Sequence, residues 1–184
     1  QVQFERLFYS RWEASRIVGK VHCVQCQRVR FEAARSMVLS GALEKLSIIH
    51  FATHAVVDTS RPSLGGLVLS LYNRSGVRIP GLLSLQDVGQ LNLHAQLVVL
   101  SACETAIGEE LGGEGLMSVG RAFLYAGAKR VIASLWLVND LSTADLMQSF
   151  YDFMINGHLT PSAALRQAQL NAAKDGISPY YWAC

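Results

Sequence analysis

Runs of apolar residues alternate along this chain with segments in which apolar residues recur at helical spacing. Residues 47–52, 95–100 and 130–137 are apolar runs of strand length, and they predict buried strands. The helices predicted from spacing and end signals cover residues 10–19, 31–43, 115–126 and 141–156, with a last helix beginning at Thr160 and Pro161. Strands separated by helices indicate crossover connections, so we expect an α/β fold with a mainly parallel sheet and helices on both faces.

Local signals predict smaller elements between these helices and strands. Residues 65–70 predict a short strand, and residues 73–76 predict a turn. Ser84, followed three residues later by Asp87, matches a capping box and predicts the start of a short helix. Gly127 lies just past the helix expected before it, at the position where glycine commonly terminates a helix.

Length and composition narrow the class of protein. The 184-residue length predicts a single domain over residues 1–184, and a content of 51% hydrophobic and 16% charged residues excludes an intrinsically disordered chain. No apolar run approaches the roughly 20 residues that span a bilayer, so we expect no membrane segment. Four cysteines do not form a disulfide scaffold, which favours a cytoplasmic location. A net charge of +2 gives no reason to expect nucleic acid as a partner.

The two ends of the sequence predict a fragment of a longer protein. The first residue is Gln1 rather than methionine, and the chain stops within an aromatic run at residues 180–182. We expect that run to begin a buried strand that continues beyond Cys184.

Candidate catalytic residues follow two of the predicted strands. In parallel sheets, active sites gather at the carboxyl ends of the strands. His54 follows the first strand and Cys103 follows the second, so both are expected at the same edge of the sheet. A thiol beside an imidazole is the arrangement of a cysteine nucleophile with its base. Their separation is 103 − 54 = 49 residues, close to the roughly 50 residues that separate His from Cys in caspases.

Other candidate sites are weaker. A lone cysteine in an apolar strand is commonly a small core residue, and a lone histidine is commonly just hydrogen-bonded. His50 and His54 lie four residues apart, but no acidic residue completes a metal motif. Cys23 and Cys26 have the spacing of a zinc or redox site, yet only His22 lies nearby as a further ligand. We therefore expect no metal and no cofactor.

Two motifs resemble the signatures of CHAT domains, which are caspase-like modules commonly found after tetratricopeptide repeats. They are residues 50–54 (HFATH) and residues 100–106 (LSACETA). The resemblance continues in collinear order through residues 113–116, 121–128, 134–140, 164–169 and 179–183, and it spans roughly residues 10–184. It implies a caspase-hemoglobinase fold related to caspases and separase. It also implies an upstream repeat domain and one more strand beyond the C-terminus.

The same resemblance implies a cysteine endopeptidase that cleaves a protein or peptide substrate. Cys103 would be the nucleophile and His54 the base and acid, while the backbone N–H groups of Ala55 and Cys103 would form the oxyanion hole. The family usually has glycine directly after the histidine. Ala55 keeps the N–H donor, but it would be strained if the position required a positive φ.

Substrate-binding residues are implied by a similarity of residues 135–140 to a separase segment that carries a pocket-lining aspartate. Asp140 matches that aspartate, and the nearby Glu104 adds negative charge, so a basic side chain before the cleaved bond is expected. Trp136 and Ser101 are further candidates to line the substrate site. An alternative role for Asp140 is to cap the helix that follows it.

Three further hypotheses remain open from the sequence. The chain can keep the fold as a non-catalytic interaction module, because a fold does not imply an activity. A Cys-dependent glutaminase is a more remote alternative, since its histidine follows the cysteine and only His158 does so here. The glycine- and glutamate-rich residues 107–115 predict a mobile loop whose ordering could switch activity.

Overall fold

The structure is a computed structural model that describes residues 4, 6–21, 27–58, 65–107, 114–136 and 140–183. The chain divides into two compact units. One unit comprises residues 28–137, and the other comprises residues 1–27 together with residues 138–184.

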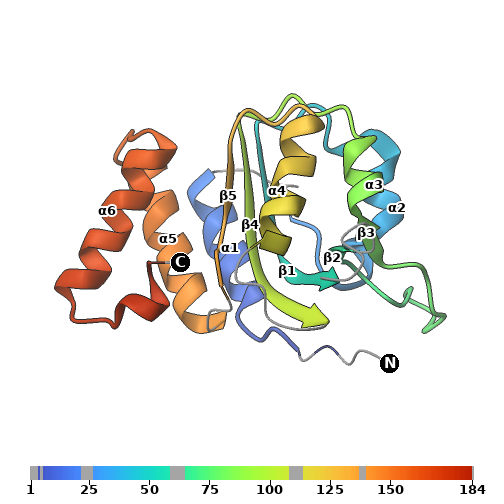
Figure 1. The fold of residues 1–184 in the computed structure, drawn as a ribbon, viewed down its shortest axis with the longest axis horizontal. Helices are drawn as coiled ribbons and strands as arrows, with labels where there is room; N and C mark the ends of the chain where they lie inside the picture. Colours follow the sequence, from blue (N-terminus) through green and yellow to red (C-terminus); the bar gives the residue numbers. More distant parts are fainter. Residues whose placement is uncertain are drawn as a thin grey trace. The chain divides into compact units, whose positions relative to one another are not determined.

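The unit of residues 28–137 is built on a five-stranded sheet (Figure 1). Its strands are β1 (Ile48–Asp58), β2 (Gly66–Val68), β3 (Leu82–Ser84), β4 (Leu97–Ile107) and β5 (Val131–Ala133). Their order across the sheet is β3-β2-β1-β4-β5. β1, β4 and β5 are parallel, whereas β2 and β3 join the β1 edge in antiparallel pairs. The prediction of an α/β fold with a mainly parallel sheet is confirmed.

The strand ends differ from the prediction at both long strands. β1 and β4 each continue for six or more residues past the apolar runs that predicted them. Residues 53–58 and 101–107 mix polar with small and β-branched side chains, which suit a strand that has one polar face. β5 is shorter than predicted, since only Val131–Ala133 pair with β4. His54 and Cys103 therefore lie within strands rather than after them.

One predicted helix is broken into short pieces. Residues 31–43 contain a 3-10 turn at Arg30–Glu32, α2 at Arg35–Met37 and a π-type turn at Val38–Ala42. Ala34, between the 3-10 turn and α2, is extended, with a φ of −95° and a ψ of 149°. Gly41 has a φ of 81°, which no right-handed helix accommodates. A continuous helix over this segment was therefore the wrong prediction.

The other two helices of this unit begin and end close to where the sequence predicts. α3 (Leu85–Gly89) starts with the expected capping box, in which Ser84 and Asp87 bond reciprocally. Asp87 also receives two hydrogen bonds from the Arg35 guanidinium, at 2.9 and 2.6 Å, and this contact lowers the pKa of the Asp87 carboxyl. α4 (Glu114–Tyr125) ends two residues before Gly127.

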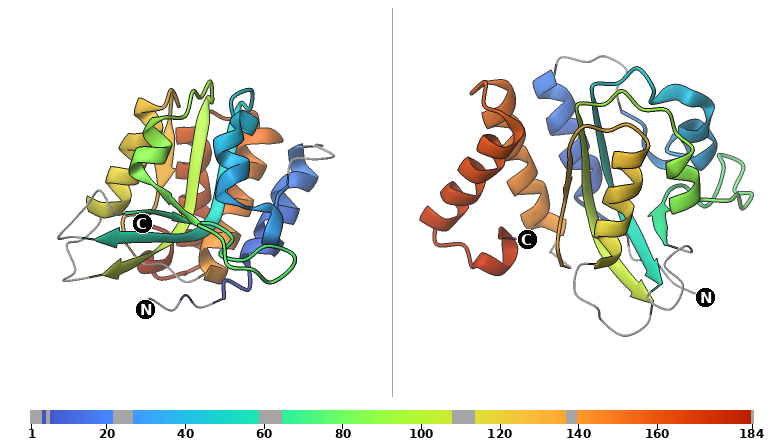
Figure 2. Two further views of the ribbon diagram at one scale, coloured as in Figure 1. Left: turned by 90° about the vertical axis from the view of Figure 1, so that its right-hand side faces the viewer. Right: turned by 45° about the horizontal axis from the view of Figure 1, so that its top comes forward.

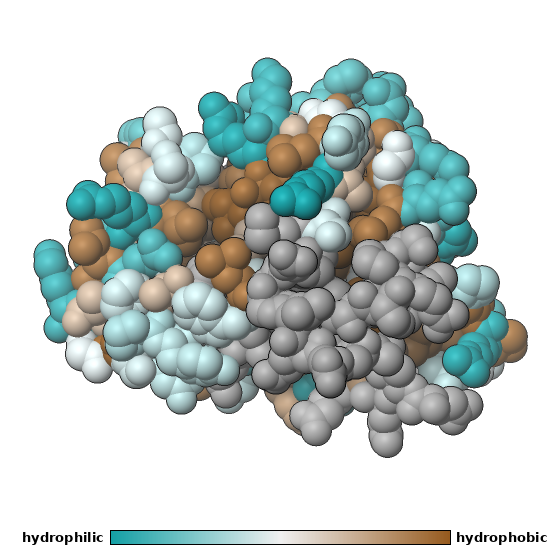
Figure 3. Space-filling view, in the orientation of Figure 1, coloured by the Kyte–Doolittle hydropathy of each residue, from teal (hydrophilic) through white to brown (hydrophobic). Residues whose placement is uncertain are grey.

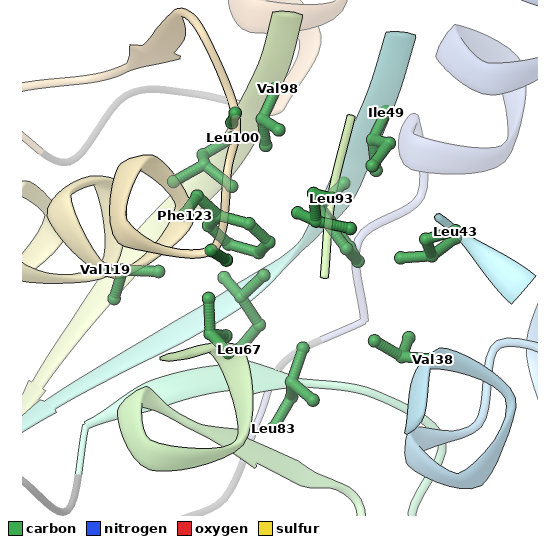
Figure 4. Close-up of a cluster of buried hydrophobic side chains, with 14 of the residues drawn as sticks. Val38, Leu43, Ile49, Leu67, Leu83, Leu93, Val98, Leu100, Val119 and Phe123 are labelled. Carbon is green, nitrogen blue, oxygen red and sulfur yellow. The ribbon is translucent and has the colours of Figure 1, made fainter. Parts of the chain in front are cut away.

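A cluster of buried apolar residues lies on one face of the sheet. Side chains from β1, β4 and the β2–β3 pair gather there with Val119 and Phe123 of α4 and Val38 of the π-type turn (Figure 4). The rings of Phe51 on β1 and Phe123 on α4 lie 5.4 Å apart at their centres. The most deeply buried members of the cluster, each at 0% exposure, include Val38, Leu67, Leu83, Val88, Val98 and Phe123.

The other unit contains three helices and a terminal turn. They are α1 (Ser10–Val21), α5 (Asp140–Ile155), α6 (Pro161–Lys174) and a 3-10 turn at Pro179–Tyr181 (Figure 2). α5 packs against both α1 and α6. Thr160 caps α6 through a bond from the Ala163 N–H, as predicted. The aromatic run was predicted to begin a buried strand, but Tyr180 and Tyr181 lie in the turn and are exposed.

α1 and α5 run parallel to each other. Arg16 donates a hydrogen bond to Gln148 at 2.8 Å, and Lys20 donates one to Asp152 at 2.5 Å. The two contacts are four residues apart in the same direction on both helices, which is why the helices are parallel. The Lys20 ammonium lowers the pKa of the Asp152 carboxyl. These helices also bury Glu13 and Tyr151. Burial raises the pKa of the Tyr151 phenol, and the charge of Glu13 raises it further.

The surface in Figure 3 carries hydrophilic side chains along much of its rim, with apolar side chains gathered between them. No helix within the described residues combines the length and the apolar composition that crossing a membrane requires.

Replacing Gly127 by alanine should destabilise the sheet-containing unit. Gly127 has a φ of +108°, and a Cβ there would lie 2.1 Å from the Leu93 carbonyl oxygen. The Leu93 N–H bonds Ala126 O at 2.7 Å, so the two segments cannot simply move apart. We expect Gly127→Ala to lower the free energy of unfolding by about 2–4 kcal/mol in urea denaturation.

The matched control is Gly89→Ala, because nothing lies within 4 Å of a Cβ at that helical position. We expect it to change the free energy of unfolding by no more than about 1 kcal/mol, and in the stabilising direction. Equal stability of the two variants would contradict the close approach of Gly127 to Leu93.

Candidate functional site

The candidate site lies on the two central strands of the sheet. β1 and β4 pair in parallel over eleven consecutive positions, from Ile48 with Leu97 to Asp58 with Ile107. His54 is the partner of Cys103 in this register. Neighbouring strands lie about 4.8 Å apart, so the backbones of these two residues are direct neighbours. The two residues singled out from the sequence are thus brought together.

Strand alternation assigns the two positions to one face. Ile49, Phe51 and Ala55 of β1 and Val98 and Leu100 of β4 belong to the apolar core. Successive residues of a strand alternate between faces, so even-numbered positions of β1 and odd-numbered positions of β4 lie on the opposite face. His54 and Cys103 both fall on that opposite face. The core and the candidate site therefore use the two sides of the same strands.

His54 is held from both sides of its strand. It pairs with Val68 of β2 on one side and with Cys103 of β4 on the other. Its side chain is half-buried. Thr53, the preceding residue, donates a hydrogen bond from its hydroxyl to the Val68 carbonyl oxygen. A position in the middle of a paired strand fixes the backbone from which the imidazole extends.

The expected oxyanion donors are embedded in the sheet. Ala55 pairs with Leu67 of β2 on one side and with Glu104 of β4 on the other. Its N–H points toward one of these two strands, and in either case it is hydrogen-bonded within the sheet. Ala55 is fully buried and has an ordinary strand backbone without positive φ, so the strain considered for alanine does not arise. Cys103 pairs with β1 only, because the described pairing of β4 with β5 ends at Leu100.

The expected substrate-binding residues are distributed over different parts of the chain. Ser101 shares the face of Cys103, and its hydroxyl oxygen is buried without a hydrogen-bond partner among the described residues. Glu104 is one residue further along β4, so alternation places its position on the opposite face. Trp136 follows β5 and is half-buried.

Asp140 has a role within the helical unit that the sequence did not reveal. It is the first residue of α5, and its Oδ2 accepts a hydrogen bond of 2.8 Å from the Tyr9 backbone N–H. This bond ties the segment before α1 to the start of α5. Tyr9 was not identified from the sequence because its contribution is a main-chain donor, which leaves no signature in the residue type.

The sequence matches the model of the "CHAT domain" family over residues 1–184. The chain belongs to the CHAT family. This agrees with the resemblance of the HFATH and LSACETA motifs, which β1 and β4 place side by side. The β1–β4 register thus pairs the histidine of one CHAT motif with the cysteine of the other.

Two relatives carry the same name, Tetratricopeptide repeat protein 28. The Mus musculus protein is 36% identical over 104 residues, which is 55% of this CHAT chain and 4% of that protein. The Homo sapiens protein is 30% identical over 191 residues, which is 86% of this chain and 8% of that protein. The chain therefore spans less than a tenth of the length of either relative. No solved structure matches it significantly.

Some sequence-based expectations for the CHAT chain fall outside the described residues. Cys23 and Cys26 lie in the interval 22–26, and most of the loop expected to be mobile lies in the interval 108–113. In the described part of the chain, no group of three or more His, Cys, Asp or Glu residues could hold a metal ion. His50 and His54 lie about 13 Å apart along β1, which is too far for one ion.

Replacing Ser101 by alanine should leave the stability of the CHAT domain unchanged or slightly raised. Its buried hydroxyl oxygen lacks a partner among the described residues, so its removal relieves a desolvation cost. Thr53→Val is the matched control on the adjacent strand, because it removes a hydroxyl that does bond, to Val68 O. We expect the control to lose about 1 kcal/mol of unfolding free energy in urea denaturation. If Ser101→Ala lost more unfolding free energy than Thr53→Val, the Ser101 hydroxyl could not be an unsatisfied buried group.

Proposed function

We propose that this CHAT domain is a cysteine endopeptidase that uses His54 and Cys103 as a dyad. The observation that supports it is the parallel register in which these residues are direct partners on one face of the sheet. The cluster of buried residues that includes Phe51, Ala55 and Leu100 lies on the other face. A thiol and an imidazole on adjacent rigid strands form the pair that activates a cysteine nucleophile.

In the proposed reaction, the Cys103 thiolate attacks the carbonyl carbon of a peptide bond and forms a carbon–sulfur bond. The protonated His54 imidazole then gives its proton to the departing amine as the carbon–nitrogen bond breaks. Water, deprotonated by His54, attacks the resulting thioester and releases the acid and the Cys103 thiolate. No oxidant, metal or cofactor is required for these steps to balance.

The proposed oxyanion donors must be free of other hydrogen bonds in the active form. The N–H groups of Ala55 and Cys103 can bind a tetrahedral oxyanion only when they are not bonded to neighbouring strands. Ala55 has strand partners on both sides. We therefore propose that the active form separates the ends of β1 and β4 beyond the dyad, and that the fully paired form is latent. Loss of one such donor typically lowers the rate about 100- to 1,000-fold.

Substrate preference is proposed for residues around the dyad. Ser101 lies two positions before Cys103 on the same face, where its hydroxyl can bond a substrate main chain. Asp140 is proposed to favour Arg or Lys before the cleaved bond. Trp136 stays a separate candidate for substrate binding, whereas the position of Glu104 is on the face of β4 opposite Cys103. The upstream partner is proposed to be a tetratricopeptide-repeat domain, as in the names of both relatives.

A second candidate function is a non-catalytic interaction module. The continuous pairing of β1 and β4 favours it, because an uninterrupted ladder leaves Ala55 without a donor to offer a substrate. The two candidates make opposite predictions for a reactive probe.

A peptidyl acyloxymethyl ketone ending in arginine should label the wild-type chain and fail to label Cys103→Ala. His54→Ala should slow labelling by about 100-fold or more, because the imidazole no longer assists the thiol. The matched control is His50→Ala, which lies on the same face of β1, four residues from His54. The probe should label His50→Ala at the wild-type rate. Mass spectrometry of the labelled peptide measures each rate.

Two results would decide against the endopeptidase. Labelling that persists in Cys103→Ala would assign the reactivity to another cysteine. An unlabelled wild-type chain, tested both alone and fused to the repeats found in its relatives, would favour the non-catalytic module.

Asp140→Asn should reduce the preference for Arg and Lys before the cleaved bond by about tenfold or more, measured with a peptide library. The substitution removes the charge but keeps an oxygen that accepts the Tyr9 N–H, so the helical unit should stay folded. Asp145→Asn, at an exposed position of α5, is the control and should leave the preference unchanged. A retained basic preference in Asp140→Asn would restrict Asp140 to its contact with Tyr9.

A further inference from the structure

The edge of the sheet next to β3 offers main-chain groups to a partner. β2 and β3 continue outward as one hairpin through residues 70–80, and all its pairs keep one register. Bonds from Leu69 N–H to Gly81 O and from Ile79 N–H to Leu71 O, at 2.8 and 2.9 Å, show that odd-numbered residues face each other within the hairpin. Even-numbered residues of its outer strand therefore direct their N–H and C=O groups outward.

The outward groups along this edge are the N–H and C=O of Arg78, the C=O of Pro80 and the N–H and C=O of Leu82. None of them has a main-chain partner among the described residues. Pro80 lacks an N–H, so it removes one donor from the edge but leaves its acceptor available. The edge is long enough for a short extended segment to add as one more strand.

A groove runs along the same edge. It has a volume of about 740 Å³, and its lining includes Leu71, Arg78, Ile79, Pro80 and Leu82. Leu82 is 36% exposed, and the hairpin also exposes Tyr72 and Val77 at 51% and 58%. These apolar side chains give an added strand surface to cover.

The charge of this edge is unbalanced toward arginine. Residues 28–37 and 70–87 contain five arginines against two carboxylates, Glu32 and Asp87. Arg74 pairs with Glu32 and Arg35 pairs with Asp87, so both carboxylates are already engaged. Arg78 is exposed and has no ion pair in the described part of the chain. A carboxylate supplied by a partner could therefore form an ion pair with Arg78.

We propose that this edge binds an extended peptide segment of a partner protein that alternates apolar with acidic residues. The peptide main chain pairs with Pro80 and Leu82, its carboxylates lie on the face of the hairpin that carries Arg78, and its apolar side chains lie on the other face, over Leu71 and Ile79. β3, β2 and β1 lie between the added peptide and β4, so the peptide binds about 19 Å across the sheet from β4, which carries Cys103. It is a docking site separate from the dyad.

Fluorescence anisotropy with a labelled peptide, Ac-Ala-Val-Asp-Val-Glu-Val-Ala-amide, tests the proposal. The 184-residue chain carries Cys103→Ala, so that cleavage cannot interfere and failure of the dyad proposal leaves this result intact. We expect saturable binding that weakens at least about threefold in Arg78→Gln and at least about threefold when Asn and Gln replace the acidic residues of the peptide. Combining both changes should add little further loss.

Arg74→Gln is the matched control, because Arg74 lies on the same hairpin but outside the groove. It should leave the affinity unchanged. N-methylation of alternate peptide residues should abolish binding in one register and preserve it in the other, since only one set of N–H groups faces the edge.

Several outcomes would overturn the proposal. They are no saturable binding of the acidic peptide to the wild-type edge, equal losses in Arg78→Gln and Arg74→Gln, and equal effects of the two N-methylation registers. Displacement of the peptide by a short oligouridine with tighter, Arg78-dependent binding would assign the edge to RNA instead.

Discussion

The parallel ladder between β1 and β4 is the constraint on which the sheet-containing unit depends. Each of its eleven positions fixes one residue of β1 against one residue of β4. β2 and β3 attach to the outer edge of β1, and β5 attaches to β4. Alternate residues of the ladder, such as Phe51 and Leu100, supply the buried core that α4 covers. Burial of such apolar side chains contributes about 1.5–3 kcal/mol each.

The same alternation separates stability from chemistry. Residues of the ladder that pack the core belong to one face, and His54 and Cys103 belong to the other. The face of His54 and Cys103 also carries the buried side chains of Val56, Leu97 and Val99, so the two polar positions adjoin apolar ones. The Ala55 N–H cannot bind a substrate while Ala55 is paired with both Leu67 of β2 and Glu104 of β4, because it is then hydrogen-bonded within the sheet. Full pairing of the sheet therefore opposes the activity proposed for this CHAT domain.

The sequence was informative where one residue type decides the local structure. The buried runs located β1 and β4, the Ser84 capping box located α3, and the two motifs located His54 and Cys103, which are partners in the sheet. The strand ends could not be predicted, because polar residues at positions such as His54 interrupt an apolar run while main-chain pairing continues. The helix expected over residues 31–43 is interrupted at Ala34, which is extended, and at Gly41, which has a positive φ. Main-chain contacts such as Tyr9 with Asp140 left no signal in the sequence.

The register of the dyad can be measured directly by disulfide trapping, in a chain whose Cys23, Cys26 and Cys184 are replaced by serine. In-register neighbours lie about 4.8 Å apart, within the range that a disulfide bridges, so His54→Cys should form a disulfide with Cys103 under mild oxidation. Ala52→Cys lies two residues out of register, about 8 Å from Cys103, and should not. Preferential trapping of the Ala52→Cys variant, or failure of His54→Cys to form the bond, would contradict the account.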